Sequence, residues 1–262
     1  MESPIISTLP TSYRKQRLIY GDEMQPYQSI FEQSADQQFE LGSLLWYSDG
    51  RKFRYSLAGA TALSKAYMTC GATNEAKLVE EAQATSYAYG AVGAYEIIVD
   101  ITTGSSFPEN GLAGGYMVVN KTDGIGDIYK VRANKVLSTD TLMRVLLETP
   151  IRTAFVAATE VTFVTNKFYK TVVVPTTATQ PATGIPLIDV SAGYYYWGQT
   201  GGEAPCYVDT GDTIVLGEPA GYPSSPAVAG ACGVTAATDE VWGIVRYVAT
   251  AGEVCILDLK LD

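Results

Sequence analysis

The sequence predicts a mainly-β fold: a sandwich-like or barrel-like β body with an extended N-terminal arm and at most one short helix. Two observations support this. Short runs rich in β-branched and aromatic residues recur between Gly, Pro, Asn and Asp residues, and only one segment combines a capping residue with good helix formers. With 47% hydrophobic and 18% charged residues in 262, the chain can bury one large β domain or two smaller ones.

Residues 1–33 predict the extended arm. They contain three prolines and no sustained hydrophobic period, yet they are too apolar for a purely solvated tail, so we expect the arm to lie on a partner surface. A frayed terminus is the alternative. The predicted contact residues include a basic cluster that would face acidic groups of the partner. They are Arg14, Lys15, Arg17, Leu18, Ile19 and Tyr20.

The clearest local signal is a hairpin over Phe39–Tyr55, where aromatic and β-rich runs flank Asp49-Gly50, a dipeptide that favours a type I′ turn. Thr73–Gln83 is the candidate helix, because a capping residue precedes good helix formers. Leu142–Leu147 is interpreted as a strand, with a helix as the alternative because capping residues precede it. The other candidate strands here are Ala94–Ile101, Tyr116–Val119, Asp127–Val131, Val161–Val164 and Tyr169–Val174.

Residues 175–186 are rich in Thr and Pro and lack an apolar period, which predicts a linker or a long surface loop. We therefore expect an arm over 1–33, a β-rich domain over 34–180 and a C-terminal β-barrel or sandwich domain over 181–262; one domain with a long loop is the alternative. Later candidate strands are Tyr194–Gln199, Cys206–Val208, Thr213–Leu216, Val241–Tyr247 and Val254–Leu261. The last is apolar at alternate and adjacent positions, which predicts a well-buried strand.

The chain contains no histidine, which excludes Ser-His-Asp and Cys-His catalysis and removes the commonest transition-metal ligand. The cysteines are widely spaced without a Cys-x-x-Cys pair, so we expect buried, unpaired thiols rather than a zinc or dithiol redox site. They are Cys70, Cys206, Cys232 and Cys255. Carboxylates are scattered on loop-like segments, as solvated turn residues are. We therefore predict a non-enzymatic protein without a cofactor or metal.

The formal charge is −10, from 18 Lys and Arg against 28 Asp and Glu, which disfavours contact with nucleic acid or an anionic membrane. No run approaches the roughly 20 apolar residues needed to span a bilayer, and the N-terminus lacks a signal-peptide pattern. The sequence thus predicts a soluble protein made in the cytoplasm, with neither nucleic acid nor membrane as a partner.

The aromatic run Tyr194-Tyr195-Tyr196-Trp197 is the most conspicuous candidate for a binding site. Consecutive aromatic residues on a strand place rings on both faces of a sheet. We expect one face to fill the core while the other meets a neighbouring subunit. Stacking on a sugar is the alternative.

Several segments resemble a known family. Gly184–Ile188 followed by Ala192–Gly202 is similar to the Gly-x-Pro, then Ala-Gly-x-Tyr-x-Trp-x-Gln-x-x-Gly pattern of the decoration (cement) proteins of tailed-bacteriophage heads. Further similar segments are Phe39–Gly42, Asp49–Tyr55, Leu57–Gly59, Thr210–Gly217, Ala229–Ala231, Trp242–Val245 and Val254–Leu261. The resemblance omits the arm. It implies a role on the outside of an icosahedral head, between major capsid subunits and often as a trimer.

The leading hypothesis is therefore a virion structural protein that binds the outer capsid surface and stabilises the head. It would be made in the host cytoplasm, and its partners would be the major capsid protein and its own copies in a homotrimer. One alternative is a glycan-binding adhesin or head-fibre base protein, with Tyr194, Tyr196 and Trp197 as a stacking platform. The other is a His-free glycoside hydrolase built on two carboxylates.

Overall fold

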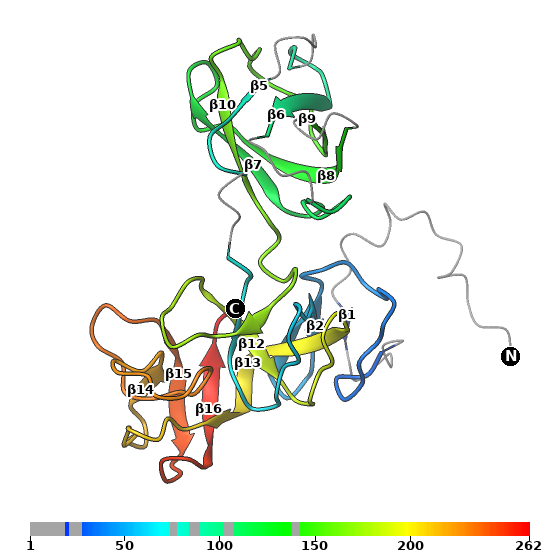
Figure 1. The fold of residues 1–262 in the computed structure, drawn as a ribbon. Helices are drawn as coiled ribbons and strands as arrows, with labels where there is room; N and C mark the ends of the chain where they lie inside the picture. Colours follow the sequence, from blue (N-terminus) through cyan, green and yellow to red (C-terminus); the bar gives the residue numbers. More distant parts are fainter. Residues whose placement is uncertain (1–18, 21–27, 74–77, 84–89, 102–106, 138–141) are drawn as a thin grey trace, which may run out of the picture. The chain divides into compact units, whose positions relative to one another are not determined.

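The computed structural model describes residues 19–20, 28–73, 78–83, 90–101, 107–137 and 142–262. The sixteen named elements in these ranges are all β-strands, drawn as arrows in Figure 1, and no α-helix occurs among them. The predicted mainly-β fold is confirmed.

The chain divides into two compact units, which are described separately. Unit 1 contains Met1–Ala72 and Lys167–Asp262, and unit 2 contains Thr73–Asn166. Unit 2 is therefore inserted into the sequence of unit 1. The chain enters and leaves unit 1 at neighbouring points, since a Cβ added to Gly71 would lie 3.0 Å from the carbonyl oxygen of Lys167.

The predicted domain boundary between residues 180 and 181 is wrong. Strand β12 (Ala182–Pro186), which follows it, pairs with β4 (Thr69–Cys70), and β4 also pairs with β11 (Val172–Val173), which precedes it. Residues on both sides of the predicted linker thus share one sheet. Composition misled here because β12, with its Thr, Gly and Pro residues, is buried along its whole length although it lacks an apolar period.

The main sheet of unit 1 has the order β1-β2-β3-β13-β12-β4-β11, and β16, β15 and β14 continue from β13. The first half of the long strand β13 pairs with β3 and its second half with β16, with a register shift between Gln199 and Gly201. One strand thus covers most of two segments predicted separately. The bounds are β1 Ile19–Tyr20, β2 Leu44–Trp46, β3 Lys52–Leu57, β13 Tyr195–Tyr207, β14 Pro219–Gly221, β15 Val241–Tyr247 and β16 Val254–Lys260.

The predicted hairpin is present as β2 and β3. Gly50 has a φ of +92°, which glycine adopts without the steric cost that a Cβ would bring. The Asp49 carboxylate accepts a hydrogen bond from the Arg51 backbone N–H at 3.0 Å, and this bond stabilises the turn. Local turn chemistry is therefore enough to fix this element.

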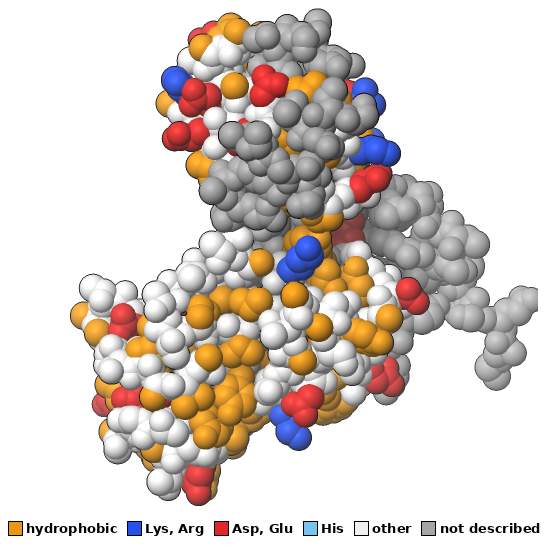
Figure 2. Space-filling view, viewed as in Figure 1, with side chains coloured by type: hydrophobic (Ala, Val, Ile, Leu, Met, Phe, Trp, Pro, Cys, Tyr) orange, Lys and Arg blue, Asp and Glu red, His pale blue; other side chains and the backbone are white. Residues whose placement is uncertain are grey.

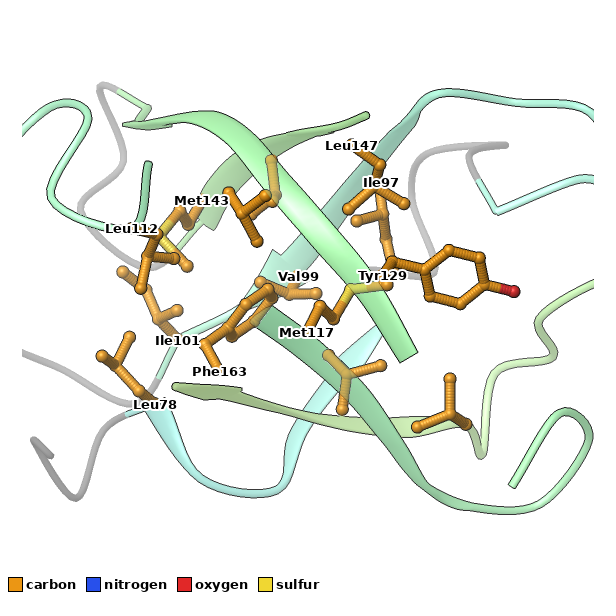
Figure 3. Packing of buried hydrophobic residues seen from close by; sticks show 14 of the residues in the cluster. Leu78, Ile97, Val99, Ile101, Leu112, Met117, Tyr129, Met143, Leu147 and Phe163 are labelled. Atoms are coloured by element: carbon orange, nitrogen blue, oxygen red, sulfur yellow. The ribbon is translucent and has the colours of Figure 1, made fainter. Parts of the chain in front are cut away.

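Unit 2 is a closed barrel with the strand order β10-β5-β6-β9-β8-β7. Inward-pointing residues alternate along its strands and meet in one core, where Ile97, Val99, Met117, Met143 and Phe163 point toward one another (Figure 3). Leu142–Leu147 is strand β9, as predicted. The other bounds are β5 Glu81–Gln83, β6 Glu96–Asp100, β7 Tyr116–Lys121, β8 Ile128–Val136 and β10 Glu160–Val164.

Two predicted elements differ from the structure. Part of Thr73–Gln83 lies outside the described residues, but its end, Glu81–Gln83, is strand β5 rather than helix. Barrel closure overrides helix propensity there, because β5 pairs with both β6 and β10. Thr213–Leu216 is a loop: Ile214 is buried, whereas Val215 and Leu216 are exposed.

Candidate interaction surface

Two members of the aromatic run lie in the core of unit 1. Trp197 is 1% exposed, and its indole N–H donates a hydrogen bond to the Gln28 carbonyl oxygen at 3.0 Å. Its ring centroid lies 5.0 Å from that of Tyr55 and 5.2 Å from that of Phe39. Tyr196 is equally buried, with its hydroxyl 2.9 Å from the Thr171 hydroxyl, and burial raises the pKa of Tyr196.

The other two members lie nearer the surface. Tyr195 is half-buried and its ring stacks on Tyr55 at a centroid distance of 5.8 Å. Tyr194 precedes β13 and is 36% exposed. A stacking platform of Tyr194, Tyr196 and Trp197 is therefore not available to a sugar, because two of its three rings are buried. Contact between the run and a neighbouring subunit stays a prediction.

Of the predicted arm contacts, Arg14, Lys15, Arg17 and Leu18 lie outside the described residues. Ile19 and Tyr20 form β1, whose backbone pairs in parallel with Leu45 and Trp46 of β2. These two residues thus join the sheet of their own chain. Their contact with a partner stays a prediction.

The predicted arm boundary at residue 33 lies too far along the chain. Ile30 is buried in the aromatic core, and the Gln28 side chain is 3% exposed. The Gln28 amide oxygen accepts a hydrogen bond from the Tyr55 hydroxyl at 2.7 Å, and its nitrogen donates to the Tyr195 carbonyl at 2.8 Å. Residues 28–33 lack periodicity because they pack as an irregular segment, which is why the sequence pattern did not identify them as part of unit 1.

The strongest candidate for an interaction surface is the outer side of β13, β16 and β15. Inward-facing residues of β16 (Cys255, Leu257, Leu259) fill the core, yet the intervening Val254 and Ile256 are 44% and 38% exposed. Strand pairing places further apolar side chains beside them. We call this set the outer apolar face: Pro205, Tyr207, Ile244, Tyr247, Val254 and Ile256.

Cross-strand pairing arranges this face in rows. One row aligns Pro205, Ile256 and Tyr247, and the next pairs Tyr207 with Val254. The Tyr207 ring also stacks on Tyr67 at a centroid distance of 4.9 Å. Side chains in register on one side of a sheet pack as a continuous layer, so the rows form one apolar surface.

A charged groove of about 580 Å³ borders the outer apolar face on the side of Glu203 and Asp258. Its lining carries both signs, with Arg51, Lys52 and Arg246 near Asp49, Glu203 and Asp258. Glu203 and Asp258 belong to the row next to Ile256, and Arg246 forms an ion pair with Glu203 at 3.3 Å. The groove and the outer apolar face therefore form a continuous surface on unit 1.

Figure 2 shows a broad hydrophobic area over the strands that carry the face. The sequence did contain its signal, because β16 is apolar at adjacent positions. That pattern predicts a well-buried strand. The described residues cover the inner side of β16 but leave Val254 and Ile256 exposed, and an apolar pattern alone does not say which elements cover a strand.

Unit 2 has a smaller apolar strip on the outside of β7, β8 and β10. Tyr116 pairs with Val164, and Val118 pairs with Ile128. Tyr116, Ile128 and Val164 are 45%, 53% and 38% exposed, which resembles the exposure of residues in the outer apolar face. The strip supplies matched control positions.

All four cysteines are buried and free, as expected from their spacing. Burial raises the pKa of the Cys70 thiol to about 11. Hydrogen bonding with Cys206 raises the pKa of Cys232, and hydrogen bonding with Cys232, together with burial, raises that of Cys255. Cys70, Cys232 and Cys255 are therefore neutral thiols at pH 7.

Comparison with protein-family models, curated proteins and solved structures finds no match to this chain. Within the described ranges, no three or more Cys, Asp or Glu side chains gather as a metal site would require. Nor does this part of the chain contain a helix long and apolar enough to cross a bilayer.

Proposed function

We propose that the chain is a structural virion protein that binds the outer surface of a phage capsid between major capsid subunits and stabilises the head, acting by binding rather than by catalysis. The outer apolar face carries this proposal. Its strands bury an inner core, while Tyr247, Val254 and Ile256 remain exposed on the other side of the sheet. These side chains would gain roughly 25 cal/mol per Å² of apolar area if a second protein covered them.

The placement of the family-like segments also supports the proposal. All of them, from Phe39–Gly42 to Val254–Leu261, fall in unit 1 and none falls in unit 2. Segments from both sides of the insertion thus belong to one unit. That unit also carries the outer apolar face.

Homotrimer formation is part of the proposal. The outward residues of β13, β15 and β16 include two acids, Glu203 and Asp258, and two bases, Arg246 and Lys260. The outer side of these three strands is therefore locally neutral, although the chain carries a charge of −10. A locally neutral surface can lie against a different surface of a neighbouring copy, as the contacts of a trimer require, without strong like-charge repulsion.

Stabilisation of the head follows from mass action. A protein that binds the assembled shell and not its separate subunits stabilises the assembly by about RT ln(1 + [L]/Kd) at each site. Many sites act on one particle, so a moderate affinity per site suffices.

Co-sedimentation with heads stripped of the protein tests the proposal. Wild-type chain should pellet with the heads and raise the temperature at which they release their contents. Tyr247→Lys/Ile256→Lys should bind at least ten-fold more weakly, because two charges would be buried at the contact. The matched variant Tyr116→Lys/Ile128→Lys, in unit 2, should bind as wild type does. Absence of wild-type binding, or equal weakening by both variants, would contradict the proposal.

A further inference from the structure

All four cysteines lie in one core of unit 1, and three of them, Cys206, Cys232 and Cys255, are neighbours there. Cys206 lies on β13 directly opposite Cys255 on β16, and Cys232 lies in the loop that bridges to Val208. The sulfur atoms of Cys232 and Cys255 are 3.5 Å apart, and all three side chains are fully buried. Cys70 belongs to the same core, but no sulfur contact joins it to the others among the described residues.

We propose that Cys232 and Cys255 form a disulfide when the folded chain meets an oxidising small-molecule disulfide. Within unit 1, this bond would lock β16 to the loop that contains Cys232. The sulfur atoms must approach from 3.5 Å to the roughly 2.05 Å of a disulfide. The elements that carry them are already held together, because the Cys232 backbone N–H donates to the Tyr207 carbonyl at 2.8 Å and β13 pairs along β16.

The reaction is two successive thiol–disulfide exchanges. One protein thiol, as its thiolate, attacks the small disulfide, which gives a mixed disulfide and releases one small thiol. The second protein thiolate then attacks the protein sulfur of that mixed disulfide and releases the other small thiol. Two protein thiols are oxidised, one small disulfide is reduced to two thiols, and the two protein protons end on the released thiols.

Burial controls the rate of this reaction. The closed core exposes neither thiol, so attack requires transient opening around β16 or the loop at Cys232. Oxidation of the native chain should therefore be slow, and mild denaturant below the unfolding transition should accelerate it. Once formed, the bond opposes the same opening.

The proposed disulfide also affects the outer apolar face. Cys255 points inward between Val254 and Ile256, which point outward as members of that face. A crosslink at Cys255 therefore fixes the strand that presents both residues. The inference stands on the sulfur geometry alone and does not depend on the proposed function.

The test oxidises the full chain with a mixture of oxidised and reduced glutathione in urea below the transition, followed by alkylation and peptide mass mapping without reductant. We expect one crosslink, between the peptides of Cys232 and Cys255, with a mass lower by two hydrogens than the sum of the two. The melting temperature should rise by several degrees and return after reduction. Cys70→Ala should keep both effects, whereas Cys232→Ala and Cys255→Ala should each lose them.

The mapping of the wild-type chain decides the outcome without relying on the variants. A crosslink of Cys206 to Cys255, glutathione adducts alone, or four free thiols after incubation in urea that permits opening would each overturn the assignment. A crosslink that leaves the melting temperature unchanged would overturn the proposed lock.

Discussion

Trp197 lies among the aromatic side chains of unit 1 and satisfies its indole N–H through Gln28. A ring that is packed on all sides and hydrogen-bonded contributes to stability through both apolar burial and the cost of leaving a partner unpaired. Its neighbour Tyr194 shares the same aromatic run but is partly exposed. Membership of the aromatic run therefore does not predict how much a residue contributes to stability. The burial of each side chain determines how strongly its substitution destabilises the fold.

Trp197→Ala should lower the free energy of unfolding by about 3–5 kcal/mol, the usual cost of a large aromatic deletion in a core. Urea denaturation followed by circular dichroism measures it. Tyr194→Ala, the control, should change stability by less than about 0.5 kcal/mol. Equal effects of the two substitutions would show that the aromatic run is not divided between core and surface.

Asp262 provides a pH-dependent contact. Burial raises the pKa of its side chain, but hydrogen bonds from Arg54 and Thr200 outweigh burial and leave the pKa below the usual 3.8. A lowered folded-state pKa gives stability that is present above the unfolded pKa and lost as pH falls through the folded one. Wild type should therefore be more stable than Asp262→Asn at pH 7, and the difference should shrink below pH 3.8. Melting curves across this range check it; a difference independent of pH would contradict it.

At the scale of elements, the sequence predicted what local chemistry determines. The β2–β3 hairpin follows from Asp49-Gly50, and the strands of unit 2 follow from alternating apolar residues between turn residues. The prediction from sequence failed where pairing with segments distant in the chain determines the secondary structure. β12 is a strand because β4 and β13 lie beside it, and β5 is a strand because it closes a barrel.

The candidate surface was predicted only in part. The aromatic run Tyr194–Trp197 is not part of it, whereas an apolar strand at Val254–Leu261 is what the sequence predicts. The exposure of Val254 and Ile256 depends on which elements cover β16, and no local pattern contains that information. The groove could not be predicted either, because it joins the β2–β3 turn to β13, β15 and β16.

The contact of β15 with β16 depends on Gly243. A Cβ at this position would lie 2.3 Å from the Asp258 carbonyl oxygen, a backbone atom that cannot turn aside. Gly243→Ala should therefore separate the strands and cost about 1–3 kcal/mol, as overpacked substitutions do. Thermal denaturation measures the effect. Val241→Ala, on the exposed side of the same strand, should cost less than about 1 kcal/mol, and an equal cost for both would contradict this close approach.

At the scale of the whole molecule, unit 2 is an insertion into a strand pair of unit 1. β4 and β11 pair with each other, and the whole of unit 2 lies between them in the sequence. Unit 2 has its own closed barrel and its own core. A unit of this kind should unfold on its own, since its stability depends on internal contacts.

Phe163→Ala should therefore destabilise unit 2 alone, by about 3–5 kcal/mol. Calorimetry should show one transition moved to lower temperature. Tryptophan fluorescence should be unchanged, because Trp46, Trp197 and Trp242 all lie in unit 1. A single transition that shifts in both measurements would show that the two units unfold together.

We propose that unit 1 binds the outer surface of a capsid. Electron cryo-microscopy of stripped heads incubated with the full chain tests it most directly. We predict added density on the outer surface between major capsid subunits, with Tyr247 and Ile256 covered by protein. Density on the inner surface, no added density at saturating concentration, or bound chains whose outer apolar face remains exposed to solvent would contradict the account.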